Sequence, residues 1–299
     1  MGYVFLGVAL LAGITKAYCG KRTSGYIETA ADAMRVSTLR MFFCVLIGTT
    51  VLLPSHGGDL FSNLNGTSLI IAFLSGLSTA VFVVCWILSV KQGAYMLVEI
   101  FVMLGVVVPL LLSHWFFGET VTLVHLFGVS LLVLATWLMF AYNRSIKQAA
   151  TPGRLIVLAI SGLANGMVGF SQKWFVSVGQ TVTTLEINLL TYFFSFVLLS
   201  AALPFFAHRQ VRPTAERPSF LKKATPYILL MSVCLLINSY CLTEAAALLE
   251  ASRLYPLNQG GALLLSTSMS AVCFGEKITK NAVIGIVLAF AGLIVIHVL

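Results

Sequence analysis

The sequence predicts an all-α integral membrane protein with ten transmembrane helices, arranged as two inverted five-helix repeats. Its composition and an internal repeat carry this prediction. Of the 299 residues, 59% are hydrophobic and 9% are charged, whereas a soluble domain has about 25% charged residues. Such a chain has too few polar side chains to face water on every side, so we expect a lipid bilayer around it.

The internal repeat is a pair of short motifs. Phe117-Gly118-Glu119 recurs as Phe274-Gly275-Glu276, with a threonine three residues after the glutamate in both copies. The copies lie 157 positions apart (276 minus 119), and each joins two long apolar segments. Many secondary transporters are built from duplicated membrane units of this kind. We therefore predict a first repeat at residues 1–147 and a second at residues 148–299.

Ten apolar segments are long enough to cross a bilayer, which takes about 20 residues each. Tight hinges are expected at Gly93, Gly118 and Gly275, and longer polar loops elsewhere. The predicted spans are residues 2–19, 34–53, 68–90, 94–116, 122–141, 154–176, 185–206, 224–246, 251–272 and 280–298.

Basic residues gather in the loops that follow the odd-numbered spans. The first span is not a secretory signal, because Lys21 and Arg22 follow its apolar stretch and do not precede it. Since cytoplasmic loops carry the excess of lysine and arginine, we predict a multi-pass plasma-membrane protein with both termini outside. Each half has five spans, so the second half enters the membrane from the opposite side and the repeat is inverted.

Both Phe-Gly-Glu segments are followed by a last helix that contains glycine, namely Gly128 in one half and Gly285 and Gly292 in the other. In this they resemble the EamA-type repeat of ten-helix members of the drug/metabolite transporter superfamily. Arg40, early in the second span, and Tyr255-Pro256-Leu257, opening the ninth, add to the resemblance, which covers essentially the whole chain.

The resemblance implies a basket of ten helices around a central cavity, lined mainly by helices 1, 3, 4, 6, 8 and 9. Helices 5 and 10 would lie at the periphery, where they support packing or contacts in a homodimer. Family members include exporters of amino acids and metabolites, uptake systems and nucleotide-sugar transporters. The related small multidrug-resistance pumps have a glutamate in the first helix, where this chain has Lys16, which argues against a cationic-drug antiporter.

Glu99 is the strongest candidate for a functional charge. It lies about five residues into the fourth span, and a charge in hydrocarbon costs several kcal/mol, roughly 3 on insertion scales. We predict that Glu99 binds a substrate amine or takes a coupling proton. The alternative is a position near the interface, or a structural ion pair with Arg40 or Lys16.

The ninth span supplies a second group of candidates, Asn258 and Gln259. Pro256 removes a backbone donor and two glycines follow the amides, so we expect a loosened helix of the kind at which transporters place binding groups. The alternative is hydrogen bonding and close packing between helices. Asn238, deep in the eighth span, is also predicted to face the cavity.

For the remaining candidate binding residues, a purely structural role is about as well supported as substrate binding. Asn165 lies within Gly162-x-x-x-Gly166, a pattern typical of tight helix packing. For Lys16 and Lys173, the functional prediction is that they hold a substrate carboxylate or phosphate, or neutralise Glu99. The structural alternative is that their side chains extend to the membrane interface. The last candidates are aromatic residues that wall the cavity or form interfacial belts, namely Trp86, Tyr95 and Tyr255.

Glu119 and Glu276 are expected to have a different role. A carboxylate suits the exposed N–H groups at a helix N-terminus, so we predict that each caps the helix that follows it.

The sequence offers little support for other classes of function. Hydrolase and metalloprotease motifs are absent, the six cysteines have no paired spacing and the five histidines are scattered. We therefore expect no enzyme activity, no metal and no cofactor. Net charge is +8, but no basic patch is interleaved with aromatic residues, so nucleic acid is not an expected partner.

These observations predict a secondary active transporter working by alternating access, with the lipid bilayer and a small-molecule substrate as its partners. The substrate class is a small polar or amphipathic metabolite that is amino acid-like, zwitterionic or amine-containing, and export is the expected direction. The alternative is an uncoupled channel or facilitator for small solutes.

Overall fold

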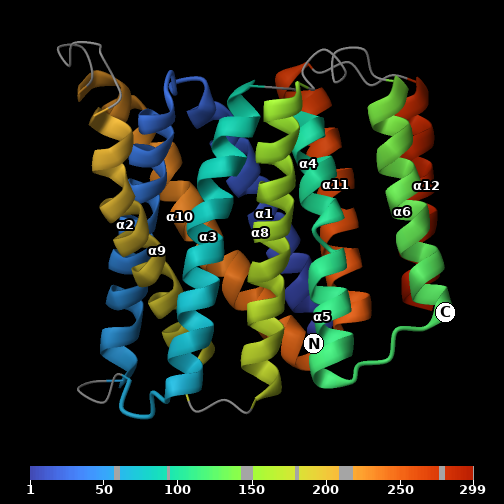
Figure 1. Cartoon of the computed structure of the whole chain (residues 1–299), viewed down its shortest axis with the longest axis horizontal. Helices are drawn as coiled ribbons and strands as arrows, with labels where there is room; N and C mark the ends of the chain where they lie inside the picture. The colour runs from blue at the N-terminus through green and yellow to red at the C-terminus, as the bar shows by residue number, and fades with distance from the viewer. Residues whose placement is uncertain are drawn as a thin grey trace.

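The structure, a computed structural model, describes residues 1–56, 61–92, 95–142, 151–178, 182–208, 218–275 and 280–298. Helices stand side by side throughout these segments, and no strand occurs in them (Figure 1). The helices are α1 (Gly2–Ser24), α2 (Ala30–His56), α3 (Gly66–Gln92), α4 (Tyr95–Leu104), α5 (Val107–Phe117), α6 (Leu123–Tyr142), α8 (Pro152–Ser177), α9 (Thr184–His208), α10 (Pro218–Leu248), α11 (Ala251–Phe274) and α12 (Lys280–Val298). Each predicted span is helical, with α4 and α5 together occupying the fourth.

Six of these helices are long and apolar enough to cross a membrane, namely α1, α2, α3, α8, α9 and α10. Shorter apolar helices lie at Phe101–Phe117, Leu123–Ala135 and Val283–Gly292. Large apolar side chains point outward around the bundle, with Trp115 72% exposed and Phe205 75% exposed. So much exposed apolar surface would promote aggregation in water, and it indicates a surface that faces lipid.

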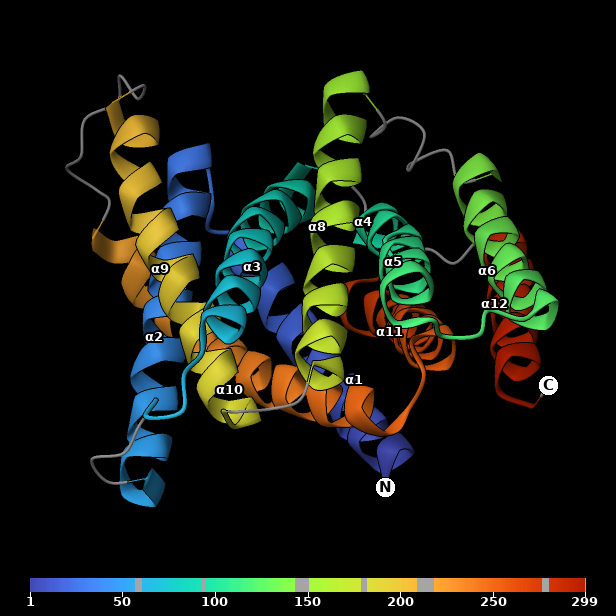
Figure 2. The ribbon, with the colours of Figure 1, turned by 60° about the horizontal axis from the view of Figure 1, so that its bottom comes forward.

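Two helices stand apart from the rest. α6 and α12 pack against each other at the edge of the bundle (Figures 1 and 2). A Cβ atom on Gly292 would lie 2.9 Å from the carbonyl oxygen of Gly128, so glycine permits this close approach. These helices are the fifth and tenth predicted spans, which the family resemblance placed at the periphery.

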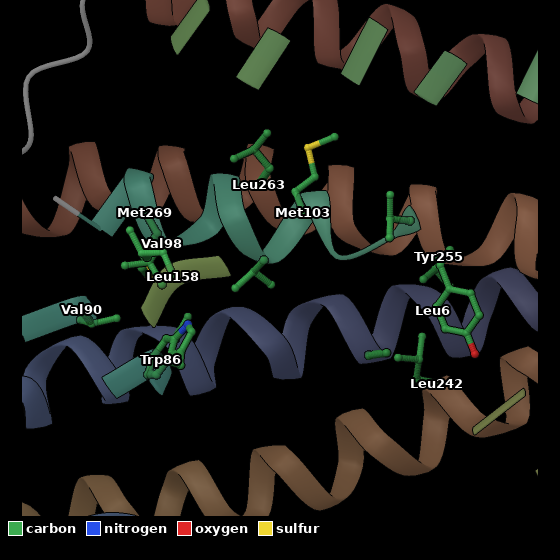
Figure 3. Close-up of a cluster of buried hydrophobic side chains, with 14 of the residues drawn as sticks. Leu6, Trp86, Val90, Val98, Met103, Leu158, Leu242, Tyr255, Leu263 and Met269 are labelled. Carbon is green, nitrogen blue, oxygen red and sulfur yellow. The ribbon is translucent and has the colours of Figure 1, made fainter. Parts of the chain in front are cut away.

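The other helices pack around a shared core. α1 lies along α10, α3 packs against both α8 and α9, and α2 packs against α9. The largest cluster of buried apolar side chains joins α1, α3, α4, α10 and α11 (Figure 3). Leu6, Trp86, Met103, Tyr255 and Leu263 belong to it. This packing surrounds the region in which the candidate site lies.

The glycines of the repeated Phe-Gly-Glu motif end their helices in the same conformation. Gly118 ends α5 with φ 66° and Gly275 ends α11 with φ 65°. This left-handed conformation favours glycine over any residue with a Cβ atom. The hinges predicted at these two residues are confirmed, whereas Gly93 lies outside the described residues.

The sequence predicts a loosened helix in the ninth span, but among the described residues the interrupted span is the fourth. α11 continues through Pro256, whereas the fourth span is interrupted between Leu104 and Val107. Pro109 has no N–H to donate to the carbonyl of Gly105, four residues earlier, and the N–H of Gly105 bonds the Val102 carbonyl at 3.1 Å. The ninth span is therefore continuous at Pro256, and the loosening expected there stays a prediction.

The interruption coincides with a close contact between α8 and the α4–α5 junction. A Cβ atom on Gly105 would lie 2.1 Å from the carbonyl oxygen of Gly162, and one on Gly166 would lie 2.3 Å from that of Gly105. Real Cβ atoms do not come so close to backbone. The Gly162-x-x-x-Gly166 pattern therefore brings two backbones together, as its packing interpretation predicted.

This contact gives a first prediction. We expect Gly166→Ala to lower the midpoint of thermal unfolding in detergent by several degrees, because overpacking of a fitted contact costs about 1–3 kcal/mol. Gly153→Ala on the same helix is the matched control, since nothing lies within 4 Å of a Cβ atom there. Equal midpoints for the two variants would contradict the contact.

Candidate functional site

A cavity of about 130 Å³ lies among the helices of the core. Its walls come from both halves of the chain. α1, α3, α4 and α5 contribute from the first half, and α8, α10 and α11 from the second. Arg40 of α2 and Tyr192 of α9 complete the wall. The six helices that the family resemblance placed around a central cavity all contribute to it.

Most of the predicted binding residues meet at this cavity. Of the other two, Lys173 lies elsewhere, and the Tyr95 side chain lies outside the described residues. The lining includes Lys16, Trp86, Glu99, Asn165, Asn238, Tyr255, Asn258 and Gln259.

The amide side chains differ in how far they are already hydrogen-bonded. The Nδ2 group of Asn238 donates to the Ala9 carbonyl at 2.7 Å, which joins α10 to α1. In contrast, Nδ2 of Asn165 and Oε1 of Gln172 are buried without a hydrogen-bond partner in the described part of the chain. A buried polar group without a partner is costly, so these two atoms suit a polar ligand.

Gln172 was not among the predicted binding residues. Its Nε2 group donates to Ser239 at 3.3 Å, and Ser239 donates to Asn188 at 2.9 Å, so its position is fixed by α9 and α10. Asn165 and Gln172 are seven residues apart, two helical turns, and so share a face of α8. That spacing is the signal that could have identified Gln172 from sequence.

Three charged side chains of the described residues line the cavity. They are Lys16 of α1, Arg40 of α2 and Glu99 of α4. Arg40 is 4% exposed and Glu99 is 8% exposed, and both lie within electrostatic range of Lys16. From the sequence, Arg40 was expected as a family feature and as a possible ion-pair partner of Glu99, but not as a binding residue, although an arginine in an apolar span is itself a signal of function.

Two aromatic residues pack at the cavity wall, each against a glycine. Tyr255 donates its hydroxyl to the Gly169 carbonyl, and a Cβ atom on Gly169 would lie 2.9 Å from its ring. Trp86 packs in the same way on Gly20 of α1. Figure 3 shows the two rings well separated along α1, with Leu6 beside Tyr255. Both side chains are held by packing and can serve as rigid apolar walls.

Lys173 takes part in a different structure, a set of contacts that we call the clasp. Its ammonium group lies 2.6 Å from Oε1 of Glu119 and donates to the carbonyls of Ala246 at 3.1 Å and Leu249 at 3.0 Å. Oε2 of Glu119 accepts the N–H of Ala251 at 2.8 Å. The clasp thus joins the turn after α5, the end of α8 and the α10–α11 junction.

The clasp corrects two predictions. Lys173 does not line the cavity, because its ammonium group is already bound by a carboxylate and two carbonyls. Glu119 does not cap α6, the next helix, but the N-terminus of α11 in the other half. At the N-terminus of α6, the Thr122 hydroxyl accepts a hydrogen bond from the N–H of His125 at 3.3 Å. Glu276, the second predicted cap, lies outside the described residues.

Residues 152–298 match the sequence profile of the EamA-like transporter family. The C-terminal half of the chain belongs to the EamA-like transporter family. The resemblance inferred from the repeated motif is therefore confirmed, and the chain is an all-helical, multi-pass membrane protein of the drug/metabolite transporter type.

Solved structures extend the likeness to the whole chain. One crystal structure, of a protein given no further description, superposes with a TM-score of 0.73 at 12% identity, over 99% of this chain and 96% of the other. At that identity the likeness shows the fold alone, and it includes the first half of the EamA-like chain. No curated protein matches the sequence.

Proposed function

We propose that this EamA-like protein is a secondary active transporter that moves a small polar or amphipathic metabolite by alternating access. The polar cavity between the two halves carries the proposal. Lys16 and Glu99 enter it from the first half, and Asn238 and Asn258 from the second. A site built from both halves can be exposed to either side when the halves move against each other.

The mechanism treats residues 1–147 and 148–299 as inverted repeats. The same left-handed turn at Gly118 and Gly275 supports this division, as does the match of the family profile to the second half. By the charge bias, both termini lie outside the plasma membrane. The clasp lies at the end of the bundle where the N-terminus lies (Figure 1), so we propose that it closes the external side.

The cavity residues divide the work of binding by chemistry. Asn238, Asn258 and Gln259 supply hydrogen-bonding groups, and Trp86 and Tyr255 cover the apolar part of the substrate. Glu99 binds an amine or carries a coupling proton. Export is the proposed direction, with an ion gradient or the substrate's own gradient as the driving force.

Counterflow in proteoliposomes tests the proposal after a thermal-shift screen has named a ligand, since a ligand stabilises the folded state by mass action. We expect transport of labelled ligand to accelerate when unlabelled ligand is present on the far side. An uncoupled channel would show no such acceleration, and that result would reject the carrier.

A variant pair then connects transport to the cavity. We expect Asn258→Ala to weaken transport at least tenfold, a loss of about 1.4 kcal/mol, because the variant removes a polar group of the wall. Ser268→Ala is the matched control on α11, since the exposed Ser268 hydroxyl donates to the Leu264 carbonyl of its own helix. Normal uptake by the Asn258 variant would place the site elsewhere.

A further inference from the structure

Arg40 is a buried cation in the wall of the cavity that the transport proposal does not use. Its side chain is 4% exposed and lines the cavity from α2. The hydroxyl of Ser232 donates to its backbone carbonyl at 3.0 Å, which fixes this part of α2 against α10. Arg40 is therefore held firmly at the wall.

The guanidinium group is incompletely bound by the protein. Its Nε atom has no hydrogen-bond partner within the described segments. The groups that interact with it electrostatically include the cation Lys16, the phenol of Tyr192 and the thiols of Cys19, Cys44 and Cys234. The phenol and the thiols are ordinarily neutral at pH 7. The ion pairs found in the described segments join Arg35 to Asp32 and Lys173 to Glu119, and neither involves Arg40.

The charge balance of the cavity points to an anionic ligand. Among the described residues, its lining carries two cations, Lys16 and Arg40, and one carboxylate, Glu99, so one positive charge has no counterpart within that part of the wall. Arginine does not release its proton in proteins, and a buried cation without a partner is strongly unfavourable. A bound anion would restore the balance and satisfy the Nε donor.

We propose that Arg40, with Lys16 beside it, binds the carboxylate of the transported substrate. The planar guanidinium fork matches the two oxygens of a carboxylate. The substrate class is thereby narrowed to small organic acids and amino acids. A cavity of about 150 Å³ in another protein holds benzene, so the 130 Å³ here suits a compact acid. This assignment rests on the proposed function, because it takes the cavity as the transport site.

Matched pairs of compounds test the assignment on the purified full-length protein. The probes are propionate with propionamide, L-leucine with L-leucinamide, and inorganic phosphate, each in a thermal-shift titration. We expect the carboxylates to stabilise the protein at concentrations at least tenfold lower than their amides. Equal responses within each pair, no response to the carboxylates, or a response to phosphate alone would overturn the proposal.

Variants of two arginines on α2 connect the response to Arg40. We expect Arg40→Met to remove the preference for carboxylates and also to raise the unfolding midpoint without ligand, because it removes an unpaired buried cation. Arg35→Met, at a residue paired with Asp32 at 3.8 Å, should keep the preference. Arg40→Lys retains the charge and should keep a weaker preference, which covers the case in which Arg40→Met fails to fold. An unchanged preference in Arg40→Met, or an undiminished one in Arg40→Lys, would overturn the role of the guanidinium group.

The two proposals fail in different ways. In one outcome, neutral or cationic compounds bind without a carboxylate preference and their transport depends on Asn258. That result supports the carrier function and rejects the assignment of Arg40 as the carboxylate-binding residue. If carboxylates bind through Arg40 but show no counterflow, the result supports a carboxylate-binding site and rejects the carrier function.

Discussion

Lys173→Met should open the end of the protein that the clasp closes. The lysine and Glu119 are largely buried, with side chains 10% and 13% exposed. Removal of one partner from a buried ion pair costs about 3–5 kcal/mol, because the remaining charge is left unpaired. A shift of about 3 kcal/mol changes the ratio of closed to open states roughly a hundredfold. In the proposed mechanism, Lys173 and Glu119 therefore stabilise the closed state relative to the open one.

Cysteine labelling measures the opening. We would place a reporter by Ala262→Cys, at a residue that lines the cavity, after replacing the six native cysteines. In liposomes, an impermeant thiol reagent added on the side of the termini should label the Lys173→Met form at least tenfold faster than the parent. The same reagent on the opposite side should show no such gain.

A double variant separates the ion pair from a general loss of structure. Removal of both charges of a buried pair is often close to neutral, whereas removal of one is not. Glu119→Gln combined with Lys173→Met should therefore return labelling toward the parent rate. Equal acceleration in the single and double variants would show that the two side chains are not coupled and that the clasp is no gate.

The sequence predicted the helices well because each span has to satisfy a strong physical condition. A segment that crosses lipid must be apolar for about 20 residues and must bond its own backbone. The ends of α3 and α11, for example, lie within two residues of the predicted limits. The turns at Gly118 and Gly275 were also predictable, since a left-handed residue after a helix favours glycine.

Contacts between distant segments could not be predicted in the same way. Glu119 was expected to cap the nearest helix, but the fold brings the N-terminus of α11 and Lys173 closer to it. Pro256 was expected to loosen the ninth span, and α11 continues through it, while Pro109 and Gly105 coincide with the break in the fourth span. Which partner a side chain meets depends on tertiary packing, which periodicity and composition do not encode.

Arg40 illustrates the same limit within the site. A single sequence shows an arginine in an apolar span, but not whether a carboxylate lies beside it. Only the arrangement of α1, α2 and α4 shows that Lys16, Arg40 and Glu99 share one cavity. Most of the polar and aromatic residues that line the cavity could be named from the sequence, whereas the net charge of the lining could not.

Glu99→Gln should abolish accumulation of substrate driven by a pH gradient while counterflow continues. Glutamine keeps the shape of the side chain but cannot exchange a proton, so it separates coupling from binding. Loss of the carboxylate also leaves Lys16 and Arg40 as the charged groups of the lining. For that reason we expect carboxylate ligands to bind Glu99→Gln at least tenfold more tightly than the parent.

Glu244→Gln is the matched control, because Glu244 lies on α10, away from the cavity lining. It should leave both accumulation and ligand affinity unchanged. If Glu99→Gln transports at the parent rate with the parent's dependence on pH, Glu99 is not the coupling group. If counterflow is lost as well for ligands that carry an amine, but kept for simple acids, Glu99 binds the amine. Glu99→Gln, tested with simple acids and with amine-containing ligands, therefore separates the two roles proposed for this carboxylate. Loss of a proton carrier affects the transport of every substrate, whereas loss of an amine partner affects only ligands that carry an amine.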